Sequence, residues 1–315
     1  MNSPTYAALG VLLVAAVCSL RSLRRRQRTE LYDDADAVLL NLRLPQSRWF
    51  NMGYWTAGTA ADDFPSAAAE LCRRVAQAAR LKAHERVCEV GYGSGDSALL
   101  FAREFEPRSY VGYTSLAGQH QLAARRAVEA KLATEGFELR RGDAARDLAT
   151  LPAGSQDVVL AVDCAYHFNT RASFLDGAHH ALAPLGRIAL TDLLIPVSDL
   201  SFVDHFLLRA LFHLAKAPWQ NFLTTSAYRD HLVQAGFDRD SIEMQDISDD
   251  VWPGFCRFMR ERDQQAGRST ILGSAWRGLS MYTKVVVWYS GARGGKRRLH
   301  FYLISARKAD LSTRG

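Results

Sequence analysis

One short segment combines a carboxylate with three glycines at alternate positions. The apolar stretch that contains Glu89 leads directly into Gly91, Gly93 and Gly95. Glycines can adopt positive φ and carry no Cβ, so they allow a ligand to approach bare backbone. A helix that begins just after them would point free N–H groups at the same place. A tight strand-to-helix turn without any ligand would use the same residues, and other features must decide between the two.

The glycine spacing separates two classes of cofactor. A dinucleotide site has the spacing Gly-x-Gly-x-x-Gly and a pyrophosphate at the helix N-terminus. Here the spacing is Gly-x-Gly-x-Gly, and Glu89 stands two residues before the first glycine, where it would repel pyrophosphate and attract a cation. The pattern resembles motif I of the class I S-adenosylmethionine (SAM) methyltransferases. That resemblance implies SAM as the cofactor, bound by Glu89 and the glycines.

The next segment indicates a second strand, Tyr110–Thr114, and a helix over Ala117–Lys131. Many methyltransferases end this strand with an acidic residue that holds the ribose hydroxyls. Thr114 occupies that position here and would bind them more weakly than a carboxylate. Gln119, early in the helix, is assigned to the same cofactor site.

A third strand is expected over residues 137–140, followed by Gly-Asp-Ala at 142–144. This tripeptide resembles the family's Gly-Asp-Ala, in which the Asp accepts from the adenine amino group. The resemblance places Asp143 and Ala144 beside the cofactor. An ordinary turn Asp explains the same residue equally well.

Two further apolar runs, residues 158–162 and 188–193, are expected to be buried strands. The segment Leu182–Arg187 between them resembles the family's Leu-x-Pro-Gly-Gly-Arg turn, with Leu185 replacing a glycine. Strands and helices alternate from 66 to 193, which predicts an α/β fold with a Rossmann-like, doubly wound, mostly parallel sheet and helices on both faces.

Ligands in such sheets bind beyond the carboxyl ends of the strands. Several residues capable of chemistry fall at or just past those ends: Glu89, Thr114, Asp143, Asp163, His167 and Asp192. Their shared location is a stronger indication of a site than any single motif. Asp163 is assigned to the cofactor site.

Three further segments make the resemblance more specific. Phe50–Trp55, Tyr166–Phe168 and Phe301–Arg307 are similar to segments of small-molecule methyltransferases of the macrolide-sugar and rebeccamycin O-methyltransferase type, over about residues 30 to 308. The resemblance implies that residues 29–65 form an arm closing over the cofactor, with Tyr54 in the cofactor site. An amphipathic segment packed on the domain would explain Tyr54 equally well.

In the same family the His after the fourth strand is the general base, assisted by an Asp of the fifth strand. The resemblance assigns these roles to His167 and Asp192. His167 is suited to the role because its unperturbed pKa lies near neutral pH. A His that caps the helix expected from Thr170 is the alternative.

Residues 194–225 interrupt the alternation with an apolar helical stretch, and residues 226–315 complete the domain. Its apolar residues are too many for one helix face. We therefore expect a cap over the active-site edge that faces an acceptor or a membrane. A fully buried helix is the alternative.

The N-terminus predicts a membrane anchor with a basic flank, residues 1–28. Residues 6–20 are almost entirely apolar and are followed by five arginines. The run is short for a bilayer span, and charge on its C-terminal side is expected to keep the catalytic domain in the cytosol. The membrane would be that of the endoplasmic reticulum or the outer mitochondrial membrane.

Composition limits the remaining functions. The five arginines nearly account for the net charge of +6, so no nucleic-acid partner is expected. Five cysteines without paired spacing argue against a structural metal. The sequence thus predicts a SAM-dependent O-methyltransferase of a lipophilic small-molecule or lipid acceptor. C- or N-methylation of a lipid or sterol, and a catalytically inactive binding protein, stay open.

Overall fold

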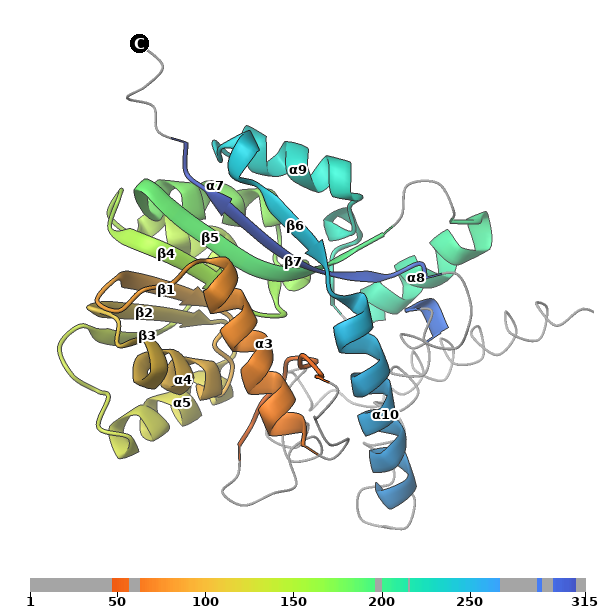
Figure 1. The fold of residues 1–315 in the computed structure, drawn as a ribbon, viewed down its shortest axis with the longest axis horizontal. Coiled ribbons are helices and arrows are strands. Elements are labelled where there is room, and N and C mark those ends of the chain that lie inside the picture. Colours follow the sequence, from red (N-terminus) through yellow and green to blue (C-terminus); the bar gives the residue numbers. More distant parts are fainter. Residues whose placement is uncertain are drawn as a thin grey trace, which may run out of the picture.

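The computed structural model describes residues 47–56, 63–195, 200–214, 216–266, 288–290 and 297–309. These residues form one seven-stranded sheet with helices on both faces (Figure 1). The strands are β1 (Arg86–Val90), β2 (Ser109–Thr114), β3 (Phe137–Arg141), β4 (Gln156–Ala161), β5 (Leu182–Leu194), β6 (Glu243–Asp246) and β7 (His300–Arg307).

The strand order is β3-β2-β1-β4-β5-β7-β6. Strands β1 to β5 pair in parallel, whereas β7 runs antiparallel between β5 and β6. The chain order reverses between β1 and β4, and a ligand is expected beyond the carboxyl ends of the strands at such a point. The predicted Rossmann-like, mostly parallel α/β fold is confirmed.

Helices cover both faces of the sheet. The sheet therefore separates two clusters of buried side chains, one on each face. One cluster includes residues of α3 (Phe64–Ala78), α4 (Asp96–Phe105) and α10 (Ser248–Ala266). The other includes residues of α7 (Arg171–Ala181) and α9 (Thr225–Gln234). The remaining helical elements are α5 (Ala117–Glu129), α6 (Ala144–Asp147), η1 (Leu148–Thr150), η2 (Ala165–His167), α8 (Phe202–Leu214), η3 (Trp219–Asn221) and η4 (Arg239–Ser241).

Alternation along the central strands explains the two clusters. In β4, Val158 and Leu160 belong to one cluster, and Val159 and Ala161 belong to the other. Successive side chains of a strand point to opposite faces. Because both faces are covered, the strand is apolar throughout, which is the pattern expected for a parallel sheet.

Strand β5 starts earlier than the sequence predicts. The segment Leu182–Arg187, expected as a turn, already belongs to β5, and a register shift in the β4–β5 pairing lies beside it. Leu185 has φ +62° in this irregular stretch and is exposed. Its left-handed conformation explains why a glycine suits this position in the resembled family.

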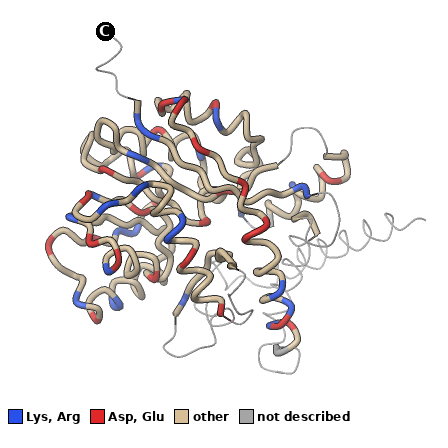
Figure 2. Tube along the Cα trace, in the orientation of Figure 1, with Lys and Arg blue, Asp and Glu red and all other residues tan. Residues whose placement is uncertain are grey.

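The expected membrane localisation is wrong. In the part of the chain that the structure describes, no helix is both long enough and apolar enough to span a bilayer. Residues 6–20, on which the expectation rested, lie outside the described residues. Lys and Arg are interspersed with Asp and Glu over the described elements (Figure 2).

The arm and the cap predicted from the sequence are described only in part. Residues 47–56 of the arm lie against α3 and α10, since Tyr54 N donates to Ala67 O and Trp55 N donates to Asp250 O, both at 2.8 Å. In the cap region, α8 buries Leu208 and Phe212 and leaves Phe202 exposed. The division of the chain into these units stays a prediction.

The conformation of Leu185 generates a stability prediction. Left-handed backbone costs a non-glycine residue roughly 1–2 kcal/mol, and glycine avoids that cost while losing part of the gain to chain entropy. Leu185→Gly is therefore expected to raise the free energy of unfolding by up to about 1 kcal/mol in urea denaturation. Leu185→Ala is the matched control, because it removes the same exposed side chain and keeps the strain. A Gly variant no more stable than the Ala variant would contradict the prediction.

Candidate active site

The glycine turn after β1 leaves one glycine facing open space. All three glycines have positive φ: +80° at Gly91, +56° at Gly93 and +92° at Gly95. A Cβ on Gly91 would lie 2.5 Å from Cys164 Sγ, and one on Gly95 would lie 2.9 Å from Ala123 Cβ. A Cβ on Gly93 would meet only the Phe50 ring, at 3.5 Å. Packing thus requires the outer two glycines, whereas Gly93 borders the cavity.

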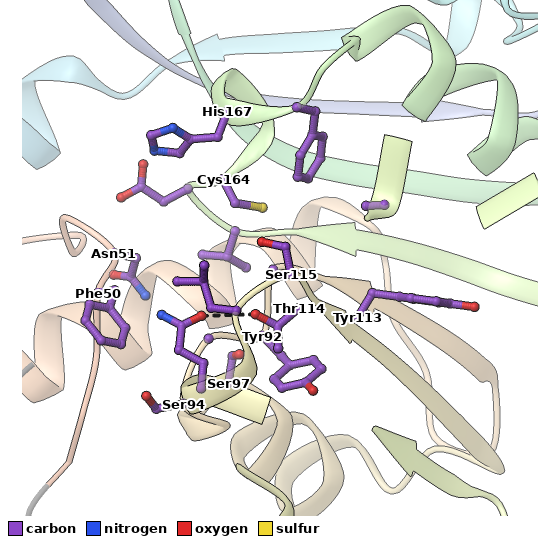
Figure 3. Close-up of a pocket in the computed structure, with 18 of the residues that line it drawn as sticks. Phe50, Asn51, Tyr92, Ser94, Ser97, Tyr113, Thr114, Ser115, Cys164 and His167 are labelled. Carbon is purple, nitrogen blue, oxygen red and sulfur yellow. Dashed lines mark hydrogen bonds between the residues drawn. The ribbon is translucent and has the colours of Figure 1, made fainter. Parts of the chain in front are cut away.

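A cavity of about 360 Å³ lies beside this turn (Figure 3). Its volume falls within the range of small-ligand sites. Eight of the residues predicted for the site line it: Gly91, Gly93, Thr114, Gln119, Asp143, Ala144, Asp163 and His167. Four predicted residues do not line it: Tyr54, Glu89, Gly95 and Asp192.

Glu89 is buried at the end of β1 and has one unsatisfied oxygen. The Tyr110 hydroxyl donates to Oε2, while Oε1 has no hydrogen-bond partner among the described residues. Burial raises the pKa of Glu89 to about 7, and the hydroxyls of Ser97 and Tyr110 oppose that shift. An adjacent ligand ammonium would favour the charged carboxylate.

Two elements border the cavity where the resemblance places the nucleoside. The Thr114 hydroxyl and Gln119 Oε1 are 3.0 Å apart and form a hydrogen bond (Figure 3). Asp143 caps α6 by accepting from Ala145 N at 3.0 Å. Asp143 therefore has a local role as the cap of α6, and it also lines the cavity.

The arm contributes residues other than the predicted Tyr54. Trp49, Phe50 and Asn51 line the cavity. The guanidinium of Arg74, a residue of α3, lies over the Tyr54 ring. Its central carbon is 4.6 Å from the ring centroid. The Tyr-Trp pair thus packs the arm onto the domain, and the residues just before it face the cavity.

Asp163 joins the arm to the sheet edge. Its Oδ2 accepts from Met52 N at 2.7 Å, and its Oδ1 accepts from the Tyr166 hydroxyl at 3.0 Å. Burial raises the pKa of Asp163 to about 7 against these two donors. Its φ of +53° marks it as a strained residue.

His167 ends η2 and borders the cavity on the side opposite Phe50 and Asn51 (Figure 3). Burial lowers the pKa of His167 to about 4, and a hydrogen bond to the Lys216 backbone opposes that shift. Because this hydrogen bond favours the protonated imidazole, a ring N–H of His167 donates and the Lys216 carbonyl accepts. A hydrogen bond of this kind favours one tautomer of the neutral ring.

Asp192 differs from the predicted arrangement because its partner is an arginine. It is fully buried in β5, where its Oδ2 lies 2.8 Å from Arg171 Nη2 and accepts from the Tyr228 hydroxyl at 3.0 Å. Its Oδ1 accepts from Leu193 N at 2.8 Å. Burial raises the pKa of Asp192, and Arg171 opposes the shift.

The site fits a cationic cofactor. Two buried polar atoms beside the glycine turn, Glu89 Oε1 and Ser94 Oγ, have no hydrogen-bond partner among the described residues. A ligand ammonium is the kind of donor that satisfies such acceptors, and Gly93 leaves room for a ligand. Sequence reasoning gave several lining residues no role. Trp49, Cys164 and Lys216 belong to no motif, whereas Phe50, Tyr166 and Phe168 lie in segments that resemble the family but were not assigned to the site.

The fold and this site define a Rossmann-like protein with a cofactor cavity at the carboxyl edge of its parallel strands. A family profile described as "Methyltransferase domain" matches residues 65–242, more than half of the chain. The chain belongs to this methyltransferase family. It is an enzyme that uses SAM as its cofactor.

Known proteins agree on the fold and vary in their chemistry. The chain is 26% identical to erythromycin 3''-O-methyltransferase of Saccharopolyspora erythraea over 296 residues, 91% of this chain and 90% of that protein. The [4+2]-cyclase SpnF matches with a TM-score of 0.66 at 21% identity, covering 87% of this chain and 93% of that one. The mycolic acid cyclopropane synthase CmaA1, complexed with SAH and CTAB, matches with a TM-score of 0.69 at 13% identity. The match covers 88% of this chain and 95% of that one.

The open space at Gly93 generates a binding prediction. Gly93→Ala places a methyl group inside the cavity and should weaken SAM binding at least 10-fold by calorimetry, because the added atom occupies ligand space. Gly154→Ala is the matched control, since Gly154 also has positive φ, +69°, a Cβ there would meet only Ala183 Cα at 3.8 Å, and the residue does not line the cavity. Equal SAM affinity in the two variants would remove the glycine turn from the cofactor site.

Proposed function

We propose that this methyltransferase transfers the SAM methyl group to a hydroxyl of a lipophilic small molecule, with His167 as the general base. The carrying observation is that His167 and the glycine turn border one cavity. The relative named erythromycin 3''-O-methyltransferase supports oxygen as the methylated atom.

The cavity walls support a lipophilic acceptor. Aromatic side chains from two separate segments line it: Trp49 and Phe50 from the arm, and Tyr166 and Phe168 around η2. These rings offer apolar surface for an acceptor and exclude water from the reacting atoms. Their placement next to His167 brings the acceptor hydroxyl and the base together.

The chemistry requires one proton to move. SAM supplies an electrophilic methyl group on a sulfonium. The acceptor oxygen forms a bond to that methyl carbon as the carbon–sulfur bond breaks, and the hydroxyl proton passes to a ring nitrogen of His167. At neutral pH the imidazole is unprotonated, because its pKa lies at about 4. Asp192 does not line the cavity, and the Lys216 carbonyl is the group that orients the ring.

An acceptor panel tests the reaction class. The full chain and methyl-labelled SAM are incubated with a macrolide glycoside bearing a free sugar hydroxyl, with its O-methylated counterpart, and with a primary amine of similar size. Product mass spectra should show one added methyl on the hydroxyl compound and none on its O-methylated counterpart. Transfer to the amine alone would replace O-methylation by N-methylation.

The lowered pKa of His167 predicts the pH profile. Since kcat/KM reports the free enzyme, its logarithm should rise through about pH 4 and level off above, as the imidazole loses its proton. His167→Ala should lower kcat by roughly 100-fold or more and abolish that rising limb, with SAM affinity unchanged.

His180→Ala is the matched control, because His180 also contacts a backbone carbonyl, Leu151 O at 3.1 Å, and does not line the cavity. Circular dichroism at each pH ensures that the protein is folded. A limb near pH 7 that persists in the His167 variant belongs to Glu89 or Asp163, whose pKa values lie there. Undiminished turnover in His167→Ala would reject the base.

A further inference from the structure

A buried polar chain connects Asp192 to the segment that carries His167. Arg171, at the start of α7, is only 2% exposed. Its Nη2 lies 2.8 Å from Asp192 Oδ2, and its Nη1 donates to the backbone carbonyl of Asn221. The guanidinium carbon also lies 4.7 Å from the centre of the Tyr228 ring. Asp192 thus holds the arginine that holds Asn221.

Asn221 contacts the backbone on both sides of His167. Its Nδ2 donates to Tyr166 O at 3.0 Å and to Phe168 O at 2.6 Å. Asn221 is 1% exposed, so water does not compete for these two bonds. Both side-chain amide protons of Asn221 are donated to the carbonyls that flank His167.

The cap-side segment also contacts the imidazole itself. The Lys216 backbone accepts from the ring, and Asn221 follows five residues later in η3. The segment therefore fixes the ring directly and the backbone of η2 through Asn221. A buried ion pair such as Arg171–Asp192 is weak support for stability, because desolvation offsets the attraction. A positioning role gives the pair a purpose that stability alone does not.

We propose that Asn221, held by Arg171 and through it by Asp192, is the positioning residue for His167. This inference rests on the proposed function, in which His167 is the base. Asp192 then acts on His167 only indirectly, through Arg171 and Asn221. Chemistry that depends on a base tolerates little displacement, since a shift of about 1 Å can cost on the order of 100-fold in rate.

The test observes His167 without any acceptor. Full-length protein labelled with ¹⁵N at histidine is titrated by NMR, and the His167 signal is assigned by its absence in His167→Ala. Wild type should show a single neutral tautomer and a pKa of about 4. Asn221→Leu keeps the side-chain size and removes both donors. In this variant the tautomers should mix and the pKa should rise by at least one unit, as the loosened ring becomes hydrated.

Gln220→Ala is the matched control, because Gln220 is the exposed neighbour of Asn221 in η3. It should leave the His167 titration unchanged. Arg171→Lys keeps the charge and loses the planar fork, so it should shift the titration in the same direction as Asn221→Leu. SAM affinity should stay within about twofold in every variant, since none of these residues lines the glycine turn. If Asn221→Leu fails to fold, Asn221→Ser is judged by the same criteria.

An unchanged His167 tautomer and pKa in the folded Asn221 variant would overturn the proposal. A second readout uses the acceptor methylated in the panel above. Asn221→Leu should lower kcat/KM at least 10-fold in the wild-type background and have no further effect in His167→Ala. Equal losses in both backgrounds would also overturn it. If His167→Ala retains full turnover while the NMR shifts occur, the proposed function fails and the positioning contact stands.

Discussion

Three carboxylates buried at neighbouring strand ends constrain the rest of this structure. Glu89 in β1, Asp163 after β4 and Asp192 in β5 are all withdrawn from water. A buried carboxylate is costly unless donors or a cation satisfy it. Each one contacts a different part of the chain: β2 through Tyr110, the arm through Met52, and α7 through Arg171. The elements around the cavity are therefore fixed to the edge of the sheet by polar contacts as well as by packing.

Local patterns were sufficient to predict the parallel sheet and the glycine turn that borders the cavity. The apolar strands and the glycine spacing are properties of a few consecutive residues, and the parallel topology brings their ends together. The same reasoning placed His167 at the cavity, because it follows β4 directly. Leu185 also fits this view, since a residue that replaces a glycine proved to have left-handed backbone.

Features that depend on distant partners could not be predicted. The sequence offered Asp192 as an assistant to His167, but Arg171 satisfies the carboxylate instead. Asn221 carries no motif, and its two contacts appear only when η3 lies beside η2. Tyr54 was assigned to the cofactor, whereas packing against α3 turns it away. The membrane interpretation depended on a segment outside the described residues.

The contact between Trp55 and α10 joins two segments that are synthesised far apart in time. Gly254 has no side chain because a Cβ there would lie 2.1 Å from the Trp55 ring, so the arm residue and the helix residue occupy one shared space. Trp55 leaves the ribosome early, and Gly254 follows after β1 to β6 but before β7. Domains fold as units while synthesis proceeds from the N-terminus. The arm can contact α3 and Asp163 earlier, but its contact with α10 forms only after residue 254 has been synthesised, so the Trp55 end of the arm is fixed late.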